Sequence, residues 1–173
     1  MMFQTRRLVI RNWEEADAEA LYKYASDARV SEPALWPRHT SPEMSRKVIS
    51  EFFMPNAYTF AIVASSVGEA IGCIGLVPAG EEYFALKGNE REVGYWVGRP
   101  FWGQGIATES LMGLIAYCCD SIGLESLLIT TLATNAASQR VAVKCGFRFV
   151  DNFIHDGLAC HAYRLSLKRD NMD

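Results

Sequence analysis

The sequence predicts a single α+β domain with a mainly antiparallel sheet and helices packed against it. Of its 173 residues, 50% are hydrophobic and 21% are charged, a composition typical of a folded domain with a sizeable core. Short strand-like runs occur in pairs joined by turns, and a strand–loop–helix–strand–helix unit occupies the C-terminal half. No repeat or linker-like segment divides the sequence, so we expect one domain over residues 1–173.

The first third of the chain predicts one strand and two helices. Residues 7–11 (RLVIR) form a short β-rich run, and residues 16–24 place apolar side chains at helical spacing. Residues 31–40 contain two prolines and no sustained period, which indicates a loop that forms either a substrate rim or an ordinary connection. A second helix is expected at residues 42–53, because Pro42 suits the first helical position.

A β-hairpin and a further strand follow. Residues 58–65 and 70–77 are β-rich, and a turn at residues 67–69 separates them. Residues 81–89 are polar and predict a loop. Residues 92–97 (EVGYWV) predict the next strand, which leads into the most informative part of the sequence.

The remaining elements alternate between helix and strand before a final hairpin. Residues 98–105 form a loop rich in glycine and aromatic residues, and residues 108–121 predict a helix with one apolar face. A buried strand at residues 126–132 precedes a helix at residues 136–145, which a glycine closes. The last predicted element is a hairpin of residues 147–154 and 159–167.

The charge balance argues against a nucleic-acid partner. The chain has 17 Lys and Arg residues against 20 Asp and Glu residues, a formal net charge of -3. Proteins that bind a nucleic-acid backbone usually carry clustered basic residues and an excess of positive charge. An anionic ligand would therefore have to be held by local groups rather than by the field of the whole protein.

Cysteine usage and hydropathy predict a cytoplasmic protein. The five cysteines are odd in number and show neither C-x-x-C nor a zinc-ligand spacing, so we expect reduced thiols and no metal site. No apolar stretch approaches the roughly 20 residues that span a bilayer. The first residues lack the long apolar segment of a signal peptide. We therefore expect no membrane partner.

Residues 93–109 (VGYWVGRPFWGQGIATE) place a strand, a glycine-rich turn and a helix start in succession. Gly98, Gly103 and Gly105 would let backbone N–H groups approach an anion closely. The helix start near residues 106–108 adds unpaired N–H groups and the positive end of the helix dipole. This order is typical of a phosphate cradle, although a purely structural turn is an equal alternative on glycine content alone.

Two other phosphate-binding motifs do not fit. A P-loop requires G-x-x-x-x-G-K-[ST], and neither glycine pair here is followed by lysine and a hydroxyl residue. A dinucleotide-binding motif requires G-x-G-x-x-G and an acidic residue at the end of the next strand. Residues 103–108 lack the third glycine, and the predicted strand at residues 126–132 ends without Asp or Glu. A nucleotide-binding oxidoreductase is therefore disfavoured.

Three motifs carry a family resemblance: WGQGIA at residues 102–107, NAAS at residues 135–138 and KCGF at residues 144–147. With these motifs the sequence resembles the GNAT superfamily of acetyl-CoA-dependent N-acetyltransferases, whose loop runs Gln/Arg-x-x-Gly-x-Gly/Ala. Trp102 stands in the first place of that loop. The opening RLVIRNWEEADAEAL is similar to the RimJ/RimL-like branch, which acetylates the N-termini of ribosomal proteins.

The resemblance implies the GNAT (acyl-CoA N-acyltransferase) fold, a central twisted, mixed, mostly antiparallel sheet that is flanked by helices and splays open to hold acetyl-CoA. The backbone of Tyr95, Trp96 and Val97 would pair with the pantetheine arm, and one N–H group would face the thioester oxygen. Asn135 would hydrogen-bond the pantetheine amides. The pyrophosphate would bind the main-chain N–H groups of Trp102, Gly103, Gln104, Gly105, Ile106, Ala107 and Thr108.

The resemblance also locates the catalytic candidates. Many family members carry a tyrosine acid at the position of Ala142, and this sequence lacks it. Ser138 is then the candidate donor to the departing sulfur, or else a first-turn serine that satisfies its own backbone. Glu92 is the leading candidate for the base, directly or through water. Three histidines are alternative bases: His39, His155 and His161.

We therefore expect an enzyme that transfers acetyl from acetyl-CoA to a primary amine, either a protein N-terminus or a small amine, by direct attack in a ternary complex. An acyl-CoA-binding module without turnover is the alternative, because the tyrosine is absent and the base is uncertain. The acceptor loops are expected around residues 35–40, 81–89 and 153–159. The aromatic content would permit a homodimer.

Overall fold

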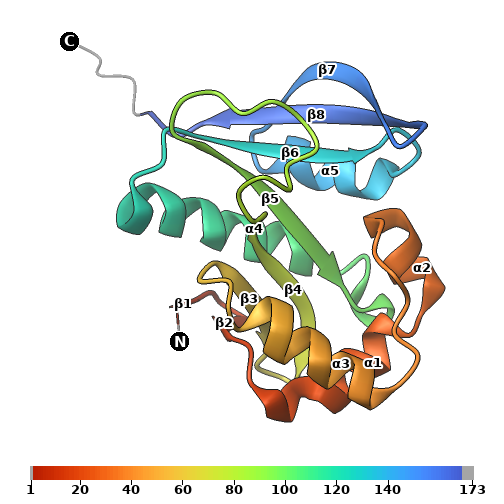
Figure 1. Cartoon of the computed structure of the whole chain (residues 1–173). Coiled ribbons are helices and arrows are strands. Elements are labelled where there is room, and N and C mark those ends of the chain that lie inside the picture. The colour runs from red at the N-terminus through yellow and green to blue at the C-terminus, as the bar shows by residue number, and fades with distance from the viewer. Residues whose placement is uncertain (1, 169–173) are drawn as a thin grey trace.

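The computed structural model describes residues 2–168 and contains an eight-stranded sheet in this range. Its strands lie in the order β1-β2-β3-β4-β5-β6-β8-β7 (Figure 1). Their bounds are β1 Phe3–Gln4, β2 Leu8–Asn12, β3 Thr59–Ala64, β4 Ala70–Leu76, β5 Glu90–Val97, β6 Ser126–Leu132, β7 Arg148–His155 and β8 Leu158–Ser166.

Helices connect the strands and cover the sheet. The α-helices are α1 Ala18–Ala25, α2 Ala28–Ser31, α3 Pro42–Val48, α4 Ile106–Tyr117 and α5 Ala136–Lys144. Short 3-10 segments lie at Glu15–Asp17, Glu32–Ala34 and Arg99–Phe101, and π-helical turns extend α3 and α4 at Ile49–Phe53 and Cys118–Ile122. In residues 2–168 no helix is both long and apolar enough to cross a bilayer.

The sheet is antiparallel except at one junction. Every neighbouring pair of strands runs antiparallel apart from β5 and β6, which are parallel. A parallel junction needs a crossover connection, and α4 supplies it. In Figure 1, β1–β4 with α1–α3 form one half of the molecule and β6–β8 with α5 form the other, with β5 between them.

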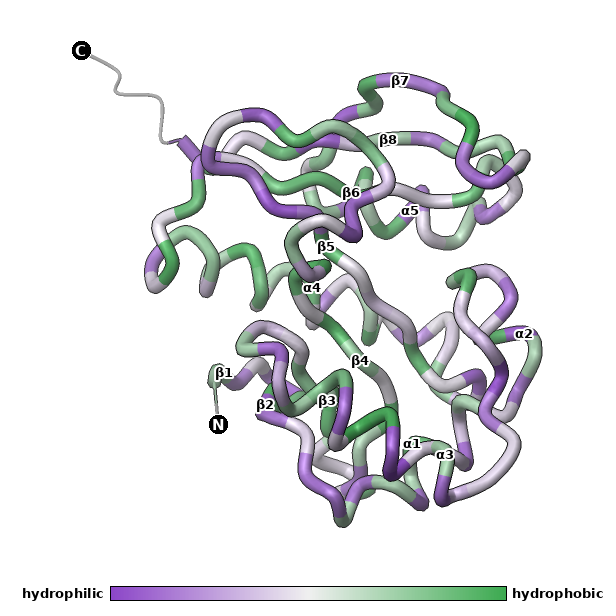
Figure 2. The backbone as a smooth tube through the Cα atoms, viewed as in Figure 1, coloured by the Kyte–Doolittle hydropathy of each residue, from purple (hydrophilic) through white to green (hydrophobic). Residues whose placement is uncertain are grey.

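Two hydrophobic clusters pack against the sheet, and the first also includes Leu127 of β6 and Ala142 of α5 in the second half. On one face of the sheet Leu111 and Leu114 of α4 pack with Phe60 of β3 in a fully buried cluster. On the other face, Leu21 of α1 and Ile49 pack in a second cluster. Figure 2 shows hydrophobic residues along β4 and α4, as expected for elements that are covered on most sides.

The structure confirms the predicted fold class and most predicted elements. The strand at residues 126–132 has the predicted bounds, and the hairpin around Asp156-Gly157 forms with both turn residues at positive φ. The helix of residues 108–121 begins two residues earlier, at Ile106, and the strand of residues 92–97 begins at Glu90. The predicted loop at residues 31–40 is wrong at its start, because its first residues lie in the end of α2 and a 3-10 turn.

Candidate functional site

The sheet opens between β5 and β6. These strands pair over three residues, from Glu90–Ser126 to Glu92–Leu128. Beyond that point β5 continues along β4 to Val97, and β6 continues along β8 to Leu132. The strand ends that face each other across the opening leave two backbone edges where an extended ligand can add as a strand.

A groove of about 2070 Å³ occupies this opening. The glycine-rich loop, the first turns of α4 and α5 and the two strand ends all line it. Among the predicted cofactor-binding residues, those that line the groove are Tyr95, Trp96, Val97, Trp102, Gly103, Gly105, Ile106, Ala107, Thr108 and Asn135. The catalytic candidates Glu92 and Ser138 line it as well, so the structure brings nearly the whole predicted site together.

The glycine-rich loop has the geometry of an anion cradle. Gly103 and Gly105 adopt φ of 72° and 76°, a left-handed conformation that costs a residue with a Cβ about 1–2 kcal/mol. Gly105 is the N-cap of α4 and has no side chain to cap the helix. The first intrahelical bond runs from the Glu109 N–H to the Gly105 carbonyl, so the N–H groups of the three residues between them remain available for a ligand.

Several contacts hold this loop in place. The indole N–H of Trp102 donates to the Val97 carbonyl at 2.7 Å, which ties the loop to the end of β5. Gln104 does not line the groove; its side-chain amide donates to Pro100, and its carbonyl accepts from Arg7 at 3.0 Å. Arg7 also pairs with Glu109 at 2.7 Å, so α4 and the turn before β2 position the loop from outside.

Ser138 contacts Tyr95 across the groove. Asn135 caps α5, because its side-chain oxygen accepts from the Ser138 N–H at 3.1 Å; the Asn135 amide group keeps its two donors for a ligand. The Ser138 hydroxyl lies 2.9 Å from the Tyr95 hydroxyl, which also lies 3.2 Å from the Ser138 carbonyl. The hydroxyl of Ser138 is therefore bonded to β5 rather than to its own helix backbone. Its 43-residue separation from Tyr95 gives no signal in the sequence.

Glu92 is a buried carboxylate at the base of the opening, 3% exposed. The Thr130 hydroxyl donates to one carboxylate oxygen, and the Tyr83 N–H donates to the other at 3.0 Å. Burial raises the pKa of Glu92 above its ordinary value, and these two hydrogen bonds oppose that rise. A carboxylate held in this way is a stronger base than an exposed one.

The three predicted acceptor loops reach the same groove. They contribute Leu35, Trp36, Pro37, His39, Glu81, Glu82, Tyr83 and His155 to its lining. Tyr83 and His155 stack with ring centroids 3.9 Å apart. Burial lowers the pKa of His39, whose Nδ1 lies 2.7 Å from the Ser45 hydroxyl. Of the three candidate histidines, His39 and His155 line the groove and His161 does not.

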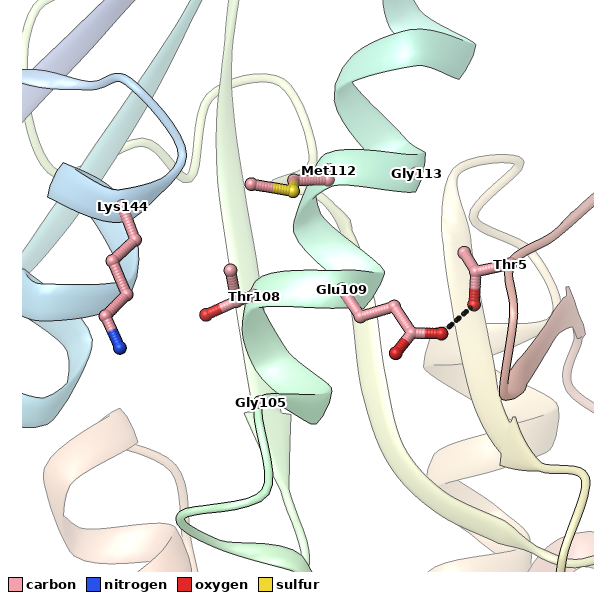
Figure 3. Close-up of a pocket in the computed structure, with 7 residues that line it drawn as sticks. All are labelled: Thr5, Gly105, Thr108, Glu109, Met112, Gly113 and Lys144. Atoms are coloured by element: carbon pink, nitrogen blue, oxygen red, sulfur yellow. Dashed lines mark hydrogen bonds between the residues drawn. The ribbon is translucent and has the colours of Figure 1, made fainter.

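Two basic residues of α5, Arg140 and Lys144, lie near the glycine-rich loop. Lys144 lies across from Thr108 in a second cavity of about 530 Å³, whereas Glu109 points away toward Thr5 (Figure 3). Lys144 and Arg140 also line the main groove. Lys144 belongs to the KCGF motif of the sequence, but no local signal in the sequence places its ammonium group beside the start of α4.

The comparisons agree with this architecture. Residues 7–148 match the family model described as "Acetyltransferase (GNAT) domain". An uncharacterised N-acetyltransferase of Schizosaccharomyces pombe is 26% identical, with 96% of this chain and 95% of that protein aligned.

Solved structures share the fold. The GNAT-family acetyltransferase of Bacillus anthracis has a TM-score of 0.80 at 23% identity, covering 95% of this chain and 97% of that one. The ribosomal L7/L12 α-N-protein acetyltransferase RimL, solved in complex with coenzyme A, has a TM-score of 0.72 at 21% identity, covering 94% and 95%. These likenesses and the family match confirm the predicted fold and family.

Proposed function

The chain belongs to the GNAT acetyltransferases, a family of enzymes that use acetyl-CoA, and we propose that it moves the acetyl group to a primary amine by direct attack in a ternary complex. The observation that carries this proposal is the junction of an open strand edge with the N-terminus of α4. An extended amide-bearing arm suits the strand edge, and a pyrophosphate suits the helix N-terminus.

The residues present fit acetyl-CoA. The N–H groups of Ile106, Ala107 and Thr108 lie at the positive end of α4, where the backbone of Gly103 and Gly105 leaves room for an anion. Lys144 and Arg140 add positive charge to the same end of the groove. The donors of Asn135 and the edge of β5 at Tyr95, Trp96 and Val97 would hold the pantetheine arm. Bound acetyl-CoA supplies the thioester that the amine attacks.

The chain's own groups would then serve the attacking amine. An N–H group of Tyr95–Val97 would donate to the thioester oxygen, where negative charge develops. Glu92 would accept the proton that the amine loses, directly or through water, and its raised pKa suits that task. Ser138 would stabilise the departing sulfur.

Direct attack fits the cysteines of the groove. A covalent acetyl-cysteine intermediate would need a thiolate of low pKa. Cys73 and Cys160 line the groove, but burial raises the pKa of Cys73 to about 12 and raises that of Cys160 as well. Both groups stay protonated at neutral pH and are poor nucleophiles, so the amine would attack the thioester itself.

The acceptor is proposed to be an α-amine at a protein N-terminus or a small amine with an apolar body. Trp36 and Trp96 pack at 5.5 Å and line the groove beside Glu81 and Glu82. Aromatic faces and carboxylates both favour a protonated amine before it loses its proton. The RimJ/RimL-like opening of the sequence, and the shared fold with RimL, support the N-terminal α-amine.

Thiol release from acetyl-CoA over a panel of N-terminal peptides and small amines tests the proposal. We expect turnover on at least one peptide with an unblocked N-terminus, and no turnover on its N-acetylated counterpart. Calorimetric binding of acetyl-CoA without turnover on any amine would instead favour the acyl-CoA-binding module.

A further inference from the structure

Ser138 can serve a departing sulfur only if its hydroxyl proton points into the groove, and the contact with Tyr95 controls that orientation. Resting on the proposed function, we infer that Tyr95 is a positioning residue: its phenol O–H donates to Ser138 Oγ and so leaves the Ser138 proton free for the sulfur of the thiolate. The position that carries the acid in many relatives is Ala142, which is fully buried here and reaches no part of the groove.

The geometry favours this direction of donation. The Tyr95 hydroxyl lies 2.9 Å from Ser138 Oγ and 3.2 Å from the Ser138 carbonyl. O–H···O bonds are most frequent at about 2.7–2.8 Å, so the hydroxyl oxygen is the better placed acceptor. In an α-helix the Ser138 carbonyl also points toward the N–H of Ala142, four residues later, and accepts a hydrogen bond from it. Ser138 then accepts from Tyr95 and has its own proton to donate.

Tyr95 is suited to remain a donor. Its ring packs against the hydrophobic core, while its hydroxyl meets the first turn of α5 in the groove. Burial raises the pKa of Tyr95 to about 12, so the phenol keeps its proton through the pH range in which an amine acceptor reacts. A protonated phenol keeps a proton to donate, and when Ser138 Oγ accepts it the serine proton stays free.

The step balances without proton transfer from either hydroxyl. The amine nitrogen forms a bond to the carbonyl carbon of the thioester. As the carbon–sulfur bond breaks, its electron pair remains on sulfur, and Ser138 donates a hydrogen bond to that charge. The proton of the amine goes to Glu92 or to water, and the released thiolate takes its proton from solvent. Two hydroxyl groups in series strengthen the outer hydrogen bond, because donation by Tyr95 polarises the Ser138 O–H.

The test compares Tyr95→Phe, Ser138→Ala and the double variant, with Tyr117→Phe as the control for loss of a partly buried phenol elsewhere in the core. We expect Tyr95→Phe to lower kcat about 3- to 10-fold, the range of one hydrogen bond, with KM for acetyl-CoA within about twofold. Ser138→Ala should lower kcat at least as much. The double variant should be no slower than Ser138→Ala, because Tyr95 acts through Ser138.

A binding measurement separates positioning from a merely structural role. An alkyl thiol such as that of CoA has a pKa near the value of about 8.5 for cysteine. Calorimetry of CoA and desulfo-CoA between pH 7 and about 9.5 therefore reports how well the site stabilises a thiolate. In the wild type we expect the CoA affinity to rise with pH relative to desulfo-CoA. Tyr95→Phe and Ser138→Ala should flatten that rise, and Tyr117→Phe should not.

The desulfo-CoA reference removes the other titrating groups from this comparison. Both complexes share the charged and titratable groups that line the groove and the thiol near Tyr95, among them Glu92, Arg140, Lys144, Cys145 and Cys160. The role of Tyr95 would be overturned if CoA affinity in Tyr95→Phe depended on pH as it does in the wild type. It would also be overturned if the two losses in kcat added in the double variant. Wild-type protein that binds CoA with this pH dependence but turns over no amine would refute the proposed function and leave the inference standing.

Discussion

Arg164 pairs with Glu90 where β5, β6 and β8 meet, at the closed end of the opening. Arg164 Nε lies 2.6 Å from one Glu90 oxygen and Nη2 lies 3.1 Å from the other. Ser126 and the Lys87 N–H complete the shell around a carboxylate whose side chain is fully buried. Burial alone would raise the pKa of Glu90, but these donors outweigh it and hold the pKa below its ordinary value.

The variant Arg164→Met removes the guanidinium and keeps most of the side-chain volume. Removal of one partner from a buried ion pair costs about 3–5 kcal/mol of unfolding free energy, because the remaining charge stays desolvated. For a chain of this size that loss lowers the Tm by about 6–20 °C in a calorimetric scan. The control Lys47→Met breaks an exposed pair with Glu51 at 4.0 Å and should cost about 1 kcal/mol or less.

The double variant Glu90→Gln with Arg164→Met should recover part of the loss, because it removes the unpaired charge. The lowered pKa of Glu90 gives a second signature. Ionised Glu90 stabilises the fold above its ordinary pKa of 4.5, and this stabilisation is lost as the pH falls through the pKa of the folded state. The difference in Tm between the wild type and Glu90→Gln should therefore shrink at acidic pH. A Tm loss for Arg164→Met equal to that of the Lys47→Met control would refute the reasoning.

Three further predictions concern the groove. Gly105→Glu should abolish acetyl-CoA binding in calorimetry, because it puts negative charge and a strained left-handed residue into the proposed phosphate site. The control Gly123→Glu, at φ 72° in open space, should bind acetyl-CoA normally. Unchanged affinity in Gly105→Glu would refute the proposed phosphate site. Glu92→Gln should lower kcat about 100-fold and remove the acidic limb of the pH–rate profile, in which wild-type activity falls as the pH drops through the raised pKa of Glu92. The same variant should be no less stable at neutral pH, since a carboxylate with a raised folded pKa loses stability as the pH rises through it; a lower Tm would contradict this. Lys144→Met should weaken acetyl-CoA binding and reduce the dependence of that binding on salt concentration. An unchanged salt dependence would mean that the phosphates of acetyl-CoA do not bind near Lys144.

Local chemistry made the cofactor side of the site predictable from the sequence. Gly103 and Gly105 adopt positive φ beside a helix start, and such a turn can be recognised from the glycines themselves. Asn135 caps α5 for an equally local reason, since its side chain reaches an N–H three residues on. Gln104 does not line the groove, and its carbonyl accepts from Arg7, a residue far away in the sequence.

Contacts between segments far apart in the chain could not be predicted. The Tyr95–Ser138 contact, the Thr130 hydroxyl on Glu92 and the stacking of Tyr83 on His155 all join separate elements. The sequence contains these residues but no signal that pairs them. Their chemistry depends on how the two halves of the sheet are held around the opening.

The sequence by itself determined most of the strands and helices and the glycine-rich turn of this protein, because propensity, periodicity and capping act within a few residues. Only the tertiary structure decided that β5 and β6 part after three paired residues, and which side chains meet in the gap. The physical reason is that pKa shifts and hydrogen bonds arise from burial beside particular neighbours. Glu92 has a raised pKa, and Glu90, two residues before it, has a lowered one, because only Glu90 has a guanidinium beside it.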